Sequence, residues 1–212
     1  MNTAEKIVHI PADSVLLEGS LALPEHALGV VVFVHGSGSS RFSPRNNAVA
    51  RVLRQASIGT LLIDLLTEAE DAIYETRFDI DLLTRRLLQT TRWLLVQPAA
   101  HHLAIGYFGA STGAAAALKA AATLGPSIGA IVSRGGRPDL AQEALGRVQS
   151  PTLLIVGGSD DVVLQLNRHA YALLNGTKQL VVIPEATHLF EEPGALEEVA
   201  RLATEWFEQY LR

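Results

Sequence analysis

The sequence LAIGYFGASTGAAAALKAAA, residues 103–122, places a G-x-S-x-G motif between an apolar run and an alanine-rich segment. The apolar run predicts a buried strand, and the alanines after the motif predict a helix. Ser111 therefore lies at a sharp turn from strand to helix, where its hydroxyl can project from the sheet toward a substrate. Gly109 and Gly113 suit this turn because strand and helix approach each other closely there. The alternative interpretation is an ordinary serine in a surface turn.

A serine in such a turn needs a base to accept its proton and a carboxylate to orient that base. Both are expected later in the chain, the carboxylate first and the histidine second. Only His169 and His188 follow Ser111. The segment around His169 has a helical composition, whereas His188 lies in a loop after a strand-like run. We therefore predict that His188 is the base.

The carboxylate is expected just after a strand, between the serine and this histidine. The most apolar run in that interval is PTLLIV, residues 151–156, and GGSDD follows it at residues 157–161. Asp160 and Asp161 are both candidates. We predict Asp160, because Asp161 fits the first turn of a helix, where the helix dipole favours an acid. Asp139 fits the first turn of an earlier helix and is the least favoured candidate.

Backbone N–H groups that stabilise negative charge on the carbonyl oxygen complete a site of this kind. The N–H of Thr112, directly after the serine, is the first predicted donor. A buried strand at residues 30–34 leads into the glycine-rich loop HGSGSS, residues 35–40. Ser37 is the predicted second donor, with Gly38 as the alternative. A phosphate-binding loop is disfavoured because neither a P-loop motif nor a dinucleotide-binding motif follows.

Taken together, these motifs resemble those of the α/β-hydrolases. The resemblance is carried by HG at 35–36, GASTG at 109–113, GGSD at 157–160 and THLF at 187–190. The phrases GSGSSR at 36–41, SRGGRPD at 133–139 and HLFEEPG at 188–194 are similar to the small dienelactone-hydrolase-like group.

The resemblance extends from about residue 30 to the end of the chain. It implies the triad Ser111, Asp160 and His188 and the hydrolysis of an ester-like bond. Dienelactone hydrolase itself uses a cysteine nucleophile, whereas this chain contains no cysteine. The resemblance therefore implies acyl transfer through a serine.

Strand-like and helical segments alternate along most of the chain. Strands are predicted at 7–10, 15–23, 30–34, 60–65, 103–108, 130–133, 152–156 and 179–183, and helices at 47–55, 80–96, 114–124 and 163–174, with others starting at 139 and 195. This alternation predicts a mostly parallel central sheet with helices on both faces, in one domain of residues 1–212. It fits the α/β-hydrolase fold. Only the 18 residues 134–151 lie where many α/β-hydrolases insert a helical lid, so we expect an open site without a large cap domain.

The composition excludes several classes of function. Apolar residues make up 48% and charged residues 18% of the chain, which suits strands covered on both faces and is consistent with a homodimer. The net charge of −5 argues against a nucleic-acid partner. Without cysteine there is no disulfide or cysteine-based metal site, and we expect neither a metal nor a cofactor. No signal-like or membrane-spanning apolar run is present, so we expect a cytoplasmic enzyme without membrane contact.

Four residues are predicted to line the substrate pocket, namely Gly38, Arg41, Tyr74 and Arg134. Tyr74 lies in the acidic segment 67–78, where Arg77 is a further candidate, although this segment can also be a solvated connection. Four arginines can bind a substrate carboxylate or instead pair with neighbouring acids, namely Arg41, Arg45, Arg134 and Arg137.

The predicted function is hydrolysis of a small-molecule acyl substrate, a carboxylic ester, lactone or thioester, through an acyl-enzyme. The same triad could serve an acyltransferase or a peptidase. A ligand-binding protein without catalytic activity on this fold is the third alternative.

Overall fold

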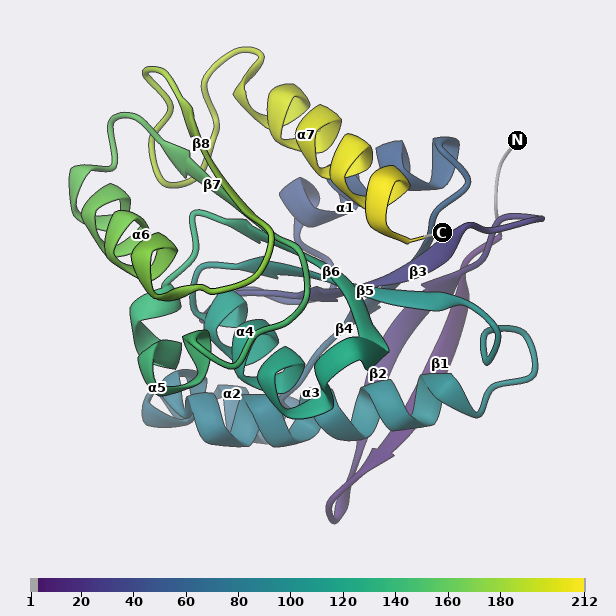
Figure 1. Cartoon of the computed structure of the whole chain (residues 1–212). Helices are drawn as coiled ribbons and strands as arrows, with labels where there is room; N and C mark the ends of the chain where they lie inside the picture. The colour runs from purple at the N-terminus through teal and green to yellow at the C-terminus, as the bar shows by residue number, and fades with distance from the viewer. Residues whose placement is uncertain (1–3, 212) are drawn as a thin grey trace.

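The computed structural model describes residues 4–211, and these form one eight-stranded sheet between two layers of helices (Figure 1). The strand order is β1-β2-β4-β3-β5-β6-β7-β8. β2 pairs antiparallel with β1 and β4, and every other neighbouring pair is parallel. The strands are β1 (Lys6–Ala12), β2 (Val15–Ala22), β3 (Gly29–Val34), β4 (Gly59–Ile63), β5 (Ala104–Ala110), β6 (Ile128–Arg134), β7 (Thr152–Gly157) and β8 (Lys178–Ile183). The predicted mostly parallel sheet is confirmed.

The helices lie on both faces of this sheet. In Figure 1, α1 and α7 lie above it, and α3, α4 and α5 lie below it. The α-helices are α1 (Pro44–Gln55), α2 (Glu68–Asp71), α3 (Ile80–Leu95), α4 (Thr112–Leu124), α5 (Gln142–Leu145), α6 (Asp161–Leu173) and α7 (Ala195–Tyr210), and short 3₁₀ helices are η1 (Glu75–Phe78), η2 (Gly125–Ser127) and η3 (Pro138–Ala141). Between β6 and β7 the chain forms only η3 and α5, so the site has no cap domain.

Two apolar cores hold the layers together, one on each face. Every residue of β3, β4 and β7 is buried, as expected for central strands covered on both sides. Phe33 and Phe108 belong to the core under α1 and α7, with their ring centroids 4.8 Å apart. Tyr107 points to the opposite core, where its hydroxyl lies 2.6 Å from that of Thr91 on α3. The sheet is thus a rigid platform for the loops at its carboxyl edge.

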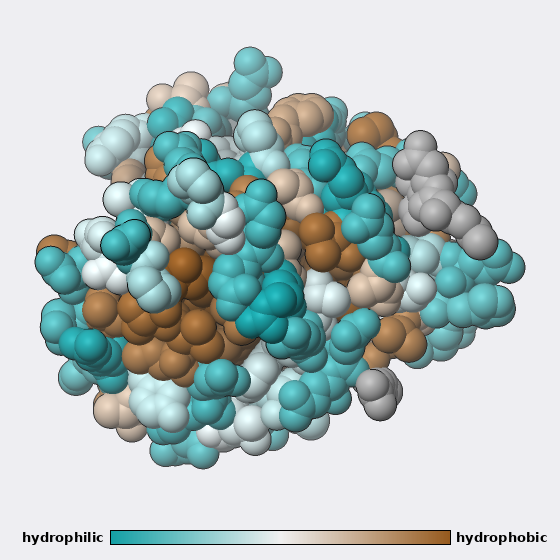
Figure 2. All heavy atoms as spheres, turned by 90° about the horizontal axis from the view of Figure 1, so that it is seen from above, coloured by the Kyte–Doolittle hydropathy of each residue, from teal (hydrophilic) through white to brown (hydrophobic). Residues whose placement is uncertain are grey.

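The outer face over α1 and α7 is mostly hydrophilic. Figure 2 looks down on this side and shows teal side chains over much of the surface, with brown apolar atoms gathered in one larger patch at the lower left. A shallow hollow of about 320 Å³ between α1 and α7 is lined by Val52 and Ala200 and flanked by charged side chains of α7. No helix of residues 4–211 combines the length and the apolar character that are needed to cross a membrane.

Most element boundaries differ from the sequence-based prediction by one or two residues, and three differences bear on the loops around the site or at the sheet edge. α1 begins at Pro44 rather than at residue 47, because the side chain of Ser43 caps it and proline is favoured in the first turn of a helix. The segment 67–78 is not a simple loop, since it contains α2 and η1. Thr67 and Glu70 form a reciprocal capping box that stabilises this one-turn helix. β1 extends to Ala12, which shortens the predicted turn at residues 11–14.

Candidate active site

Ser111 lies at the strained turn between β5 and α4. Its backbone has φ 50° and ψ −123°, which side-chain-bearing residues rarely adopt. A Cβ on Gly113 would lie 2.2 Å from the carbonyl oxygen of Val34, and a Cβ on Gly109 would lie 2.5 Å from Cα of Ala114. Only glycine fits at these two positions, because the atoms in the way belong to the backbone. The turn therefore has the geometry that its sequence predicts.

His188 and Asp160 meet across two loops at the carboxyl edge of the sheet. Nδ1 of His188 lies 2.7 Å from Oδ2 of Asp160. Because a carboxylate only accepts hydrogen bonds, the proton of a neutral imidazole lies on Nδ1, and Nε2 keeps its lone pair. The Asp160 side chain is 15% exposed and that of His188 is 39% exposed. The imidazole is therefore partly accessible, while the carboxylate is largely shielded from water.

Backbone hydrogen bonds fix these two loops against each other. The N–H of Ser159 donates to the carbonyl of Ala186 at 2.9 Å, and the N–H of Gly158 donates to that of Ile183 at 2.8 Å. The loop that carries Asp160 is thereby held beside the loop that carries His188. Their relative position is set by the backbone and does not depend on the carboxylate–imidazole contact alone.

The end of β6 connects the histidine to the serine. The carbonyl of Arg134 accepts the N–H of Ser111 at 3.3 Å. A Cβ placed on the next residue, Gly135, would lie 3.5 Å from Cε1 of His188. Ser111 thus contacts Arg134, and the imidazole lies near the residue that follows it. The Ser111 side chain is partly exposed, and its hydroxyl makes no hydrogen bond to any residue of 4–211.

The two residues predicted to form the oxyanion hole lie side by side. The N–H of Ser37 donates to Oγ1 of Thr112 at 3.0 Å. Gly36 lies against Ser111, since a Cβ on it would be 2.9 Å from Cβ of Ser111. The loop after β3 is therefore in place beside Ser111. Its predicted donor, the Ser37 N–H, is occupied by the threonine hydroxyl.

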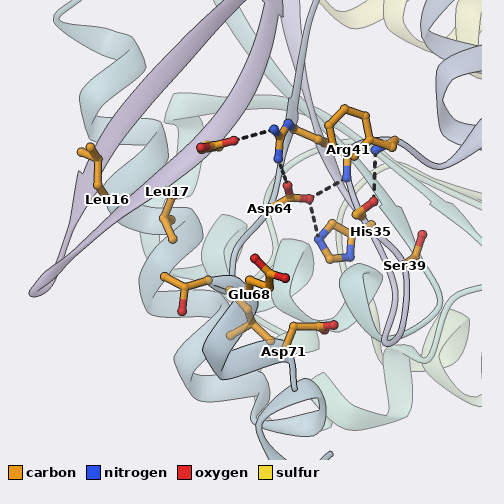
Figure 3. A pocket seen from close by; sticks show the side chains of 13 residues that line it. Leu16, Leu17, His35, Ser39, Arg41, Asp64, Glu68 and Asp71 are labelled. Atoms are coloured by element: carbon orange, nitrogen blue, oxygen red, sulfur yellow. Dashed lines mark hydrogen bonds and ion pairs between the residues drawn. The ribbon is translucent and has the colours of Figure 1, made fainter. Parts of the chain in front are cut away.

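A cavity of about 490 Å³ lies beside this loop, between β2, residues 39–42 and the start of α2 (Figure 3). Arg41 and Asp64 form an ion pair in its wall, and Glu18 binds the same guanidinium at 2.5 Å. The N–H of Arg41 also donates to Asp64 at 2.6 Å. Nε2 of His35 lies 3.6 Å from Oδ1 of Asp64. These contacts brace the loop that carries Ser37; Ser111 and His188 do not line this cavity.

Three of the four arginines considered for a substrate carboxylate pair with acids of the protein. Arg41 binds Asp64 and Glu18, as described above. Arg45 donates to Glu191 at 2.8 Å, and Arg137 donates to Asp139 at 2.8 and 2.9 Å. All three arginines therefore form ion pairs within the protein, which is the alternative interpretation of these residues.

Arg134 differs, because no carboxylate within residues 4–211 pairs with it. The residue is 8% exposed, and Nε and Nη1 are buried without a hydrogen-bond partner. Its guanidinium carbon lies 5.8 Å from the ring centroid of Phe190, and Nη2 lies 3.4 Å from the side-chain oxygen of Asn46. Burial, together with the positive charge of Arg45, lowers the pKa of Arg134 to about 10.

The remaining predicted pocket residues lie on the exposed side of the site. Tyr74 is 67% exposed and contacts Phe78, with ring centroids 5.0 Å apart. Gly38 has a φ of 68°, and a Cβ on it would lie 3.8 Å from Nη1 of Arg77. The segment 67–78 thus approaches the loop after β3, as its predicted position at the carboxyl edge requires.

Asp64 is a residue that the sequence analysis missed. A signal for it exists, because a lone carboxylate directly follows the apolar strand β4. Its partner could not be found in this way, since Arg41 lies 23 residues earlier in the chain. Within residues 4–211, no group of three or more His, Cys, Asp or Glu side chains is arranged to hold a metal ion.

Known proteins resemble this chain over nearly its whole length. No protein-family model matches the sequence. Proteins from two strains of Mycobacterium tuberculosis, each described as "Putative phosphoribosyl transferase", are 56% identical over 204 residues, which is 96% of this chain and 46% of theirs. The chain therefore spans about half the length of these curated relatives.

Solved structures cover the chain more completely. A dienelactone hydrolase from Anabaena variabilis is 55% identical, with a TM-score of 0.97 and 99% of each chain covered. An α/β serine hydrolase without a lid from Xanthomonas campestris is 22% identical, with a TM-score of 0.80 over 100% of this chain and 97% of that one. Est1E from Butyrivibrio proteoclasticus is 16% identical, with a TM-score of 0.83 over 96% and 98%. The two lower identities show the fold alone, but the match to the Anabaena protein shows the family. This chain belongs to the dienelactone-hydrolase-like group of the α/β-hydrolases.

Proposed function

We propose that this protein is a serine hydrolase that cleaves small ester-like substrates through an acyl-enzyme. The observation that carries the proposal is the 2.7 Å hydrogen bond between His188 and Asp160. It orients the imidazole with Nε2 free to accept a proton, at the same edge of the sheet as the strained Ser111. A binding protein has no need of this arrangement.

In the first step, Nε2 of His188 accepts the proton of Ser111 while Oγ bonds to the substrate carbonyl carbon. The electrons of the carbonyl double bond move to oxygen, and the N–H groups of Thr112 and Ser37 stabilise that charge. The bond to the leaving group then breaks, and His188 returns the proton to the departing oxygen or sulfur. Asp160 stabilises the imidazolium throughout but stays ionised.

In the second step, water attacks the acyl-enzyme, and His188 again acts as the base. Collapse of the intermediate releases the carboxylic acid and restores the Ser111 hydroxyl. If an amine or another alcohol takes the place of water, the same chemistry becomes acyl transfer. Product analysis with such acceptors present distinguishes transfer from hydrolysis.

The predicted pocket residues fall into two groups in this proposal. Gly38 and Tyr74 lie where they can contact a substrate directly. Arg41 and Arg134 are turned inward, and we propose that they act by holding the loops that carry Ser37 and His188. The substrate is small, because the site has no cap to enclose a long acyl chain.

The M. tuberculosis relatives carry a transferase description, but they are about twice as long as the matched region. The part that they share with this chain has a hydrolase fold, and its glycine-rich loops lack a phosphate-binding motif. We therefore propose no phosphoribosyl transfer for this chain.

Labelling with a fluorophosphonate tests the nucleophile. The wild type should react and should hydrolyse p-nitrophenyl acetate and butyrate, whereas Ser111→Ala should do neither, because no other side chain is activated. A folded wild type that neither reacts nor turns over these esters would exclude the hydrolase and favour a binding role.

Matched pairs of variants test the other two members of the triad. Asp160→Asn should lower kcat by about 10⁴-fold, because the amide holds the wrong tautomer of His188. The neighbouring Asp161→Asn should leave kcat within about twofold, since Asp161 is an exposed residue at the start of α6. His188→Ala and His169→Ala form the corresponding pair for the base. Equal effects within either pair would contradict the assignment.

A further inference from the structure

The contact between Ser37 and Thr112 joins two segments that lie 75 residues apart in the sequence. Thr112 is the first residue of α4, directly after the nucleophile, and it is 3% exposed. Its Oγ1 accepts the N–H of Ser37 at 3.0 Å. The threonine hydroxyl thus contacts one of the two backbone donors assigned to the oxyanion hole and belongs to the same residue as the other.

The hydrogen-bonding capacity of this hydroxyl is only partly used. A threonine hydroxyl accepts through its oxygen lone pairs and donates one proton. The bond from Ser37 uses a lone pair, and no acceptor for the proton of Thr112 is found within residues 4–211. In this nearly buried position an unused donor is costly unless an acceptor arrives from elsewhere.

The position of Thr112 in its helix explains why the proton is free. Thr84 and Thr91, inside α3, donate to carbonyls four residues earlier, at 2.6 and 2.8 Å. Thr112 begins its helix, so no earlier turn of α4 offers such a carbonyl. Its hydroxyl is held by Ser37 instead, with the proton left for a group outside the protein.

We propose that the hydroxyl of Thr112 is a third donor of the oxyanion hole, in addition to the backbone N–H groups. This inference rests on the serine-hydrolase function proposed above. When Ser111 Oγ bonds to the carbonyl carbon, the carbonyl oxygen gains negative charge, and Oγ1–H of Thr112 donates a hydrogen bond to it. No proton is transferred. Before substrate binds, the Ser37 N–H fixes the rotamer of Thr112. During the reaction this N–H is shared between Oγ1 of Thr112 and the carbonyl oxygen, and its bond to Oγ1 polarises the hydroxyl, which strengthens its donation.

The rival interpretation is that the hydroxyl merely fills the hole until a substrate arrives. Thr112 would then release the Ser37 N–H to the substrate and take no part in the reaction. The two interpretations predict opposite results when the hydroxyl is removed. If the Thr112 hydroxyl is an oxyanion donor, its removal lowers kcat. If it only fills the oxyanion hole before substrate binds, its removal leaves kcat unchanged or raises it.

Thr112→Val removes the hydroxyl and keeps the shape of the side chain, and Thr112→Ser keeps the hydroxyl. We expect kcat for p-nitrophenyl acetate to fall by about 10²-fold in Thr112→Val, the effect of losing one oxyanion donor, with KM within about twofold. Thr112→Ser should stay within about fivefold of the wild type. Thr123→Val, an exposed position at the far end of α4, is the matched control and should show no change.

A short-chain trifluoromethyl ketone gives a second readout, because its adduct with Ser111 carries the oxyanion without turnover. Thr112→Val should weaken its inhibition by a similar factor, and Thr112→Ser should not. If Thr112→Val does not fold, Thr112→Ala replaces it in the same comparison. Wild-type kcat and inhibition without the hydroxyl would overturn the proposal. A wild type that neither labels at Ser111 nor turns over would instead refute the hydrolase function itself.

Discussion

Arg134 carries a positive charge in a buried environment that offers it no negative partner within residues 4–211. Its guanidinium is buried, no carboxylate within residues 4–211 pairs with it, and burial with the charge of Arg45 lowers its pKa to about 10. Unpaired buried charges are rare outside functional sites because they destabilise the fold. Its backbone carbonyl binds Ser111, and its side chain lies beside Phe190, two residues after the proposed base.

We expect Arg134→Met to stabilise the protein by about 1–3 kcal/mol at pH 7, because a flexible apolar side chain replaces an uncompensated charge. The pKa of Arg134 is lower in the folded state than in the unfolded state. The destabilisation is therefore fully present at neutral pH and is relieved only as the pH rises through about 10. Urea denaturation at pH 7 measures the gain.

The same variant should lose activity on p-nitrophenyl acetate, since the loops around Ser111 and His188 lose a common contact. Arg201→Met, on an exposed ion-paired arginine of α7, is the control and should leave the urea midpoint close to that of the wild type, because ion pairs at exposed positions contribute little. A less stable Arg134→Met would mean that an acceptor from outside the protein satisfies the guanidinium.

The role of a single residue could be predicted from the sequence where it depends on neighbouring residues. It could not be predicted where it depends on a partner that is distant in the sequence. The spacing of Ser111 within its motif predicts the strained turn that the backbone adopts. The environment of Arg41 was not predictable, because its acids come from β2 and from the end of β4. For the same reason the bond between Ser37 and Thr112 required the structure.

At the scale of elements, the turn between β5 and α4 depends on close backbone approach. A methyl group on Gly113 would lie 2.2 Å from the carbonyl oxygen of Val34 and 2.5 Å from that of His35. Neither atom can rotate away, because both belong to β3 and the loop that follows it. The helix would have to move outward and carry Ser111 with it.

Gly113→Ala should therefore destabilise the protein by more than about 3 kcal/mol, since the added methyl group would clash with backbone atoms that cannot move aside. It should also remove the proposed activity on p-nitrophenyl acetate. Gly146→Ala is the matched control, because the nearest atom to a Cβ there is 3.6 Å away. It should change stability by less than about 1 kcal/mol. Thermal unfolding of both variants gives the comparison, and equal stability would refute the packing argument.

Long elements and the short helical segment that starts near residue 139 were predictable, whereas α2 and η1 were not. The strands and helices of the alternating region carry apolar patterns over many residues, so their order and type follow from the sequence. α2 and η1 are single turns of four residues each. A capping box and tertiary contacts stabilise such short helices, and these interactions produce no periodic apolar pattern in the sequence.

At the scale of the whole molecule, Arg86 on α3 ties together segments that are distant in sequence. It is 3% exposed and binds Asp13 of the β1–β2 turn at 3.1 Å and Glu70 of α2 at 2.7 Å. Nη1 also reaches the carbonyl of Leu65, after β4, at 3.4 Å. One guanidinium thus joins the antiparallel edge of the sheet to the segment beside the proposed site.

The contacts of Arg86 with Asp13 and Glu70 make the stability of the folded protein depend on pH in the acid range. Burial raises the pKa of Glu70, but hydrogen bonds from Arg86 and Thr67 outweigh it and hold the pKa below the ordinary value of 4.5. Hydrogen bonds from Gln89 and Arg85 likewise lower the pKa of Asp13. A carboxylate with a lowered pKa contributes stability above its unfolded pKa, and that contribution is lost as the pH falls through the folded pKa.

We expect the urea midpoint of the wild type to decrease as the pH falls from 5 to 3. Arg86→Met should lose about 1–3 kcal/mol at pH 7, because Glu70 loses its charged hydrogen-bond partner, whereas Asp13 keeps Arg85 and Gln89. Its midpoint should also fall less steeply with acid, since only the hydrogen bonds from Thr67 still lower the pKa of Glu70. Arg92→Met, an exposed arginine of the same helix, should behave as the wild type. An unchanged acid slope in Arg86→Met would show that the pH dependence arises elsewhere in the molecule.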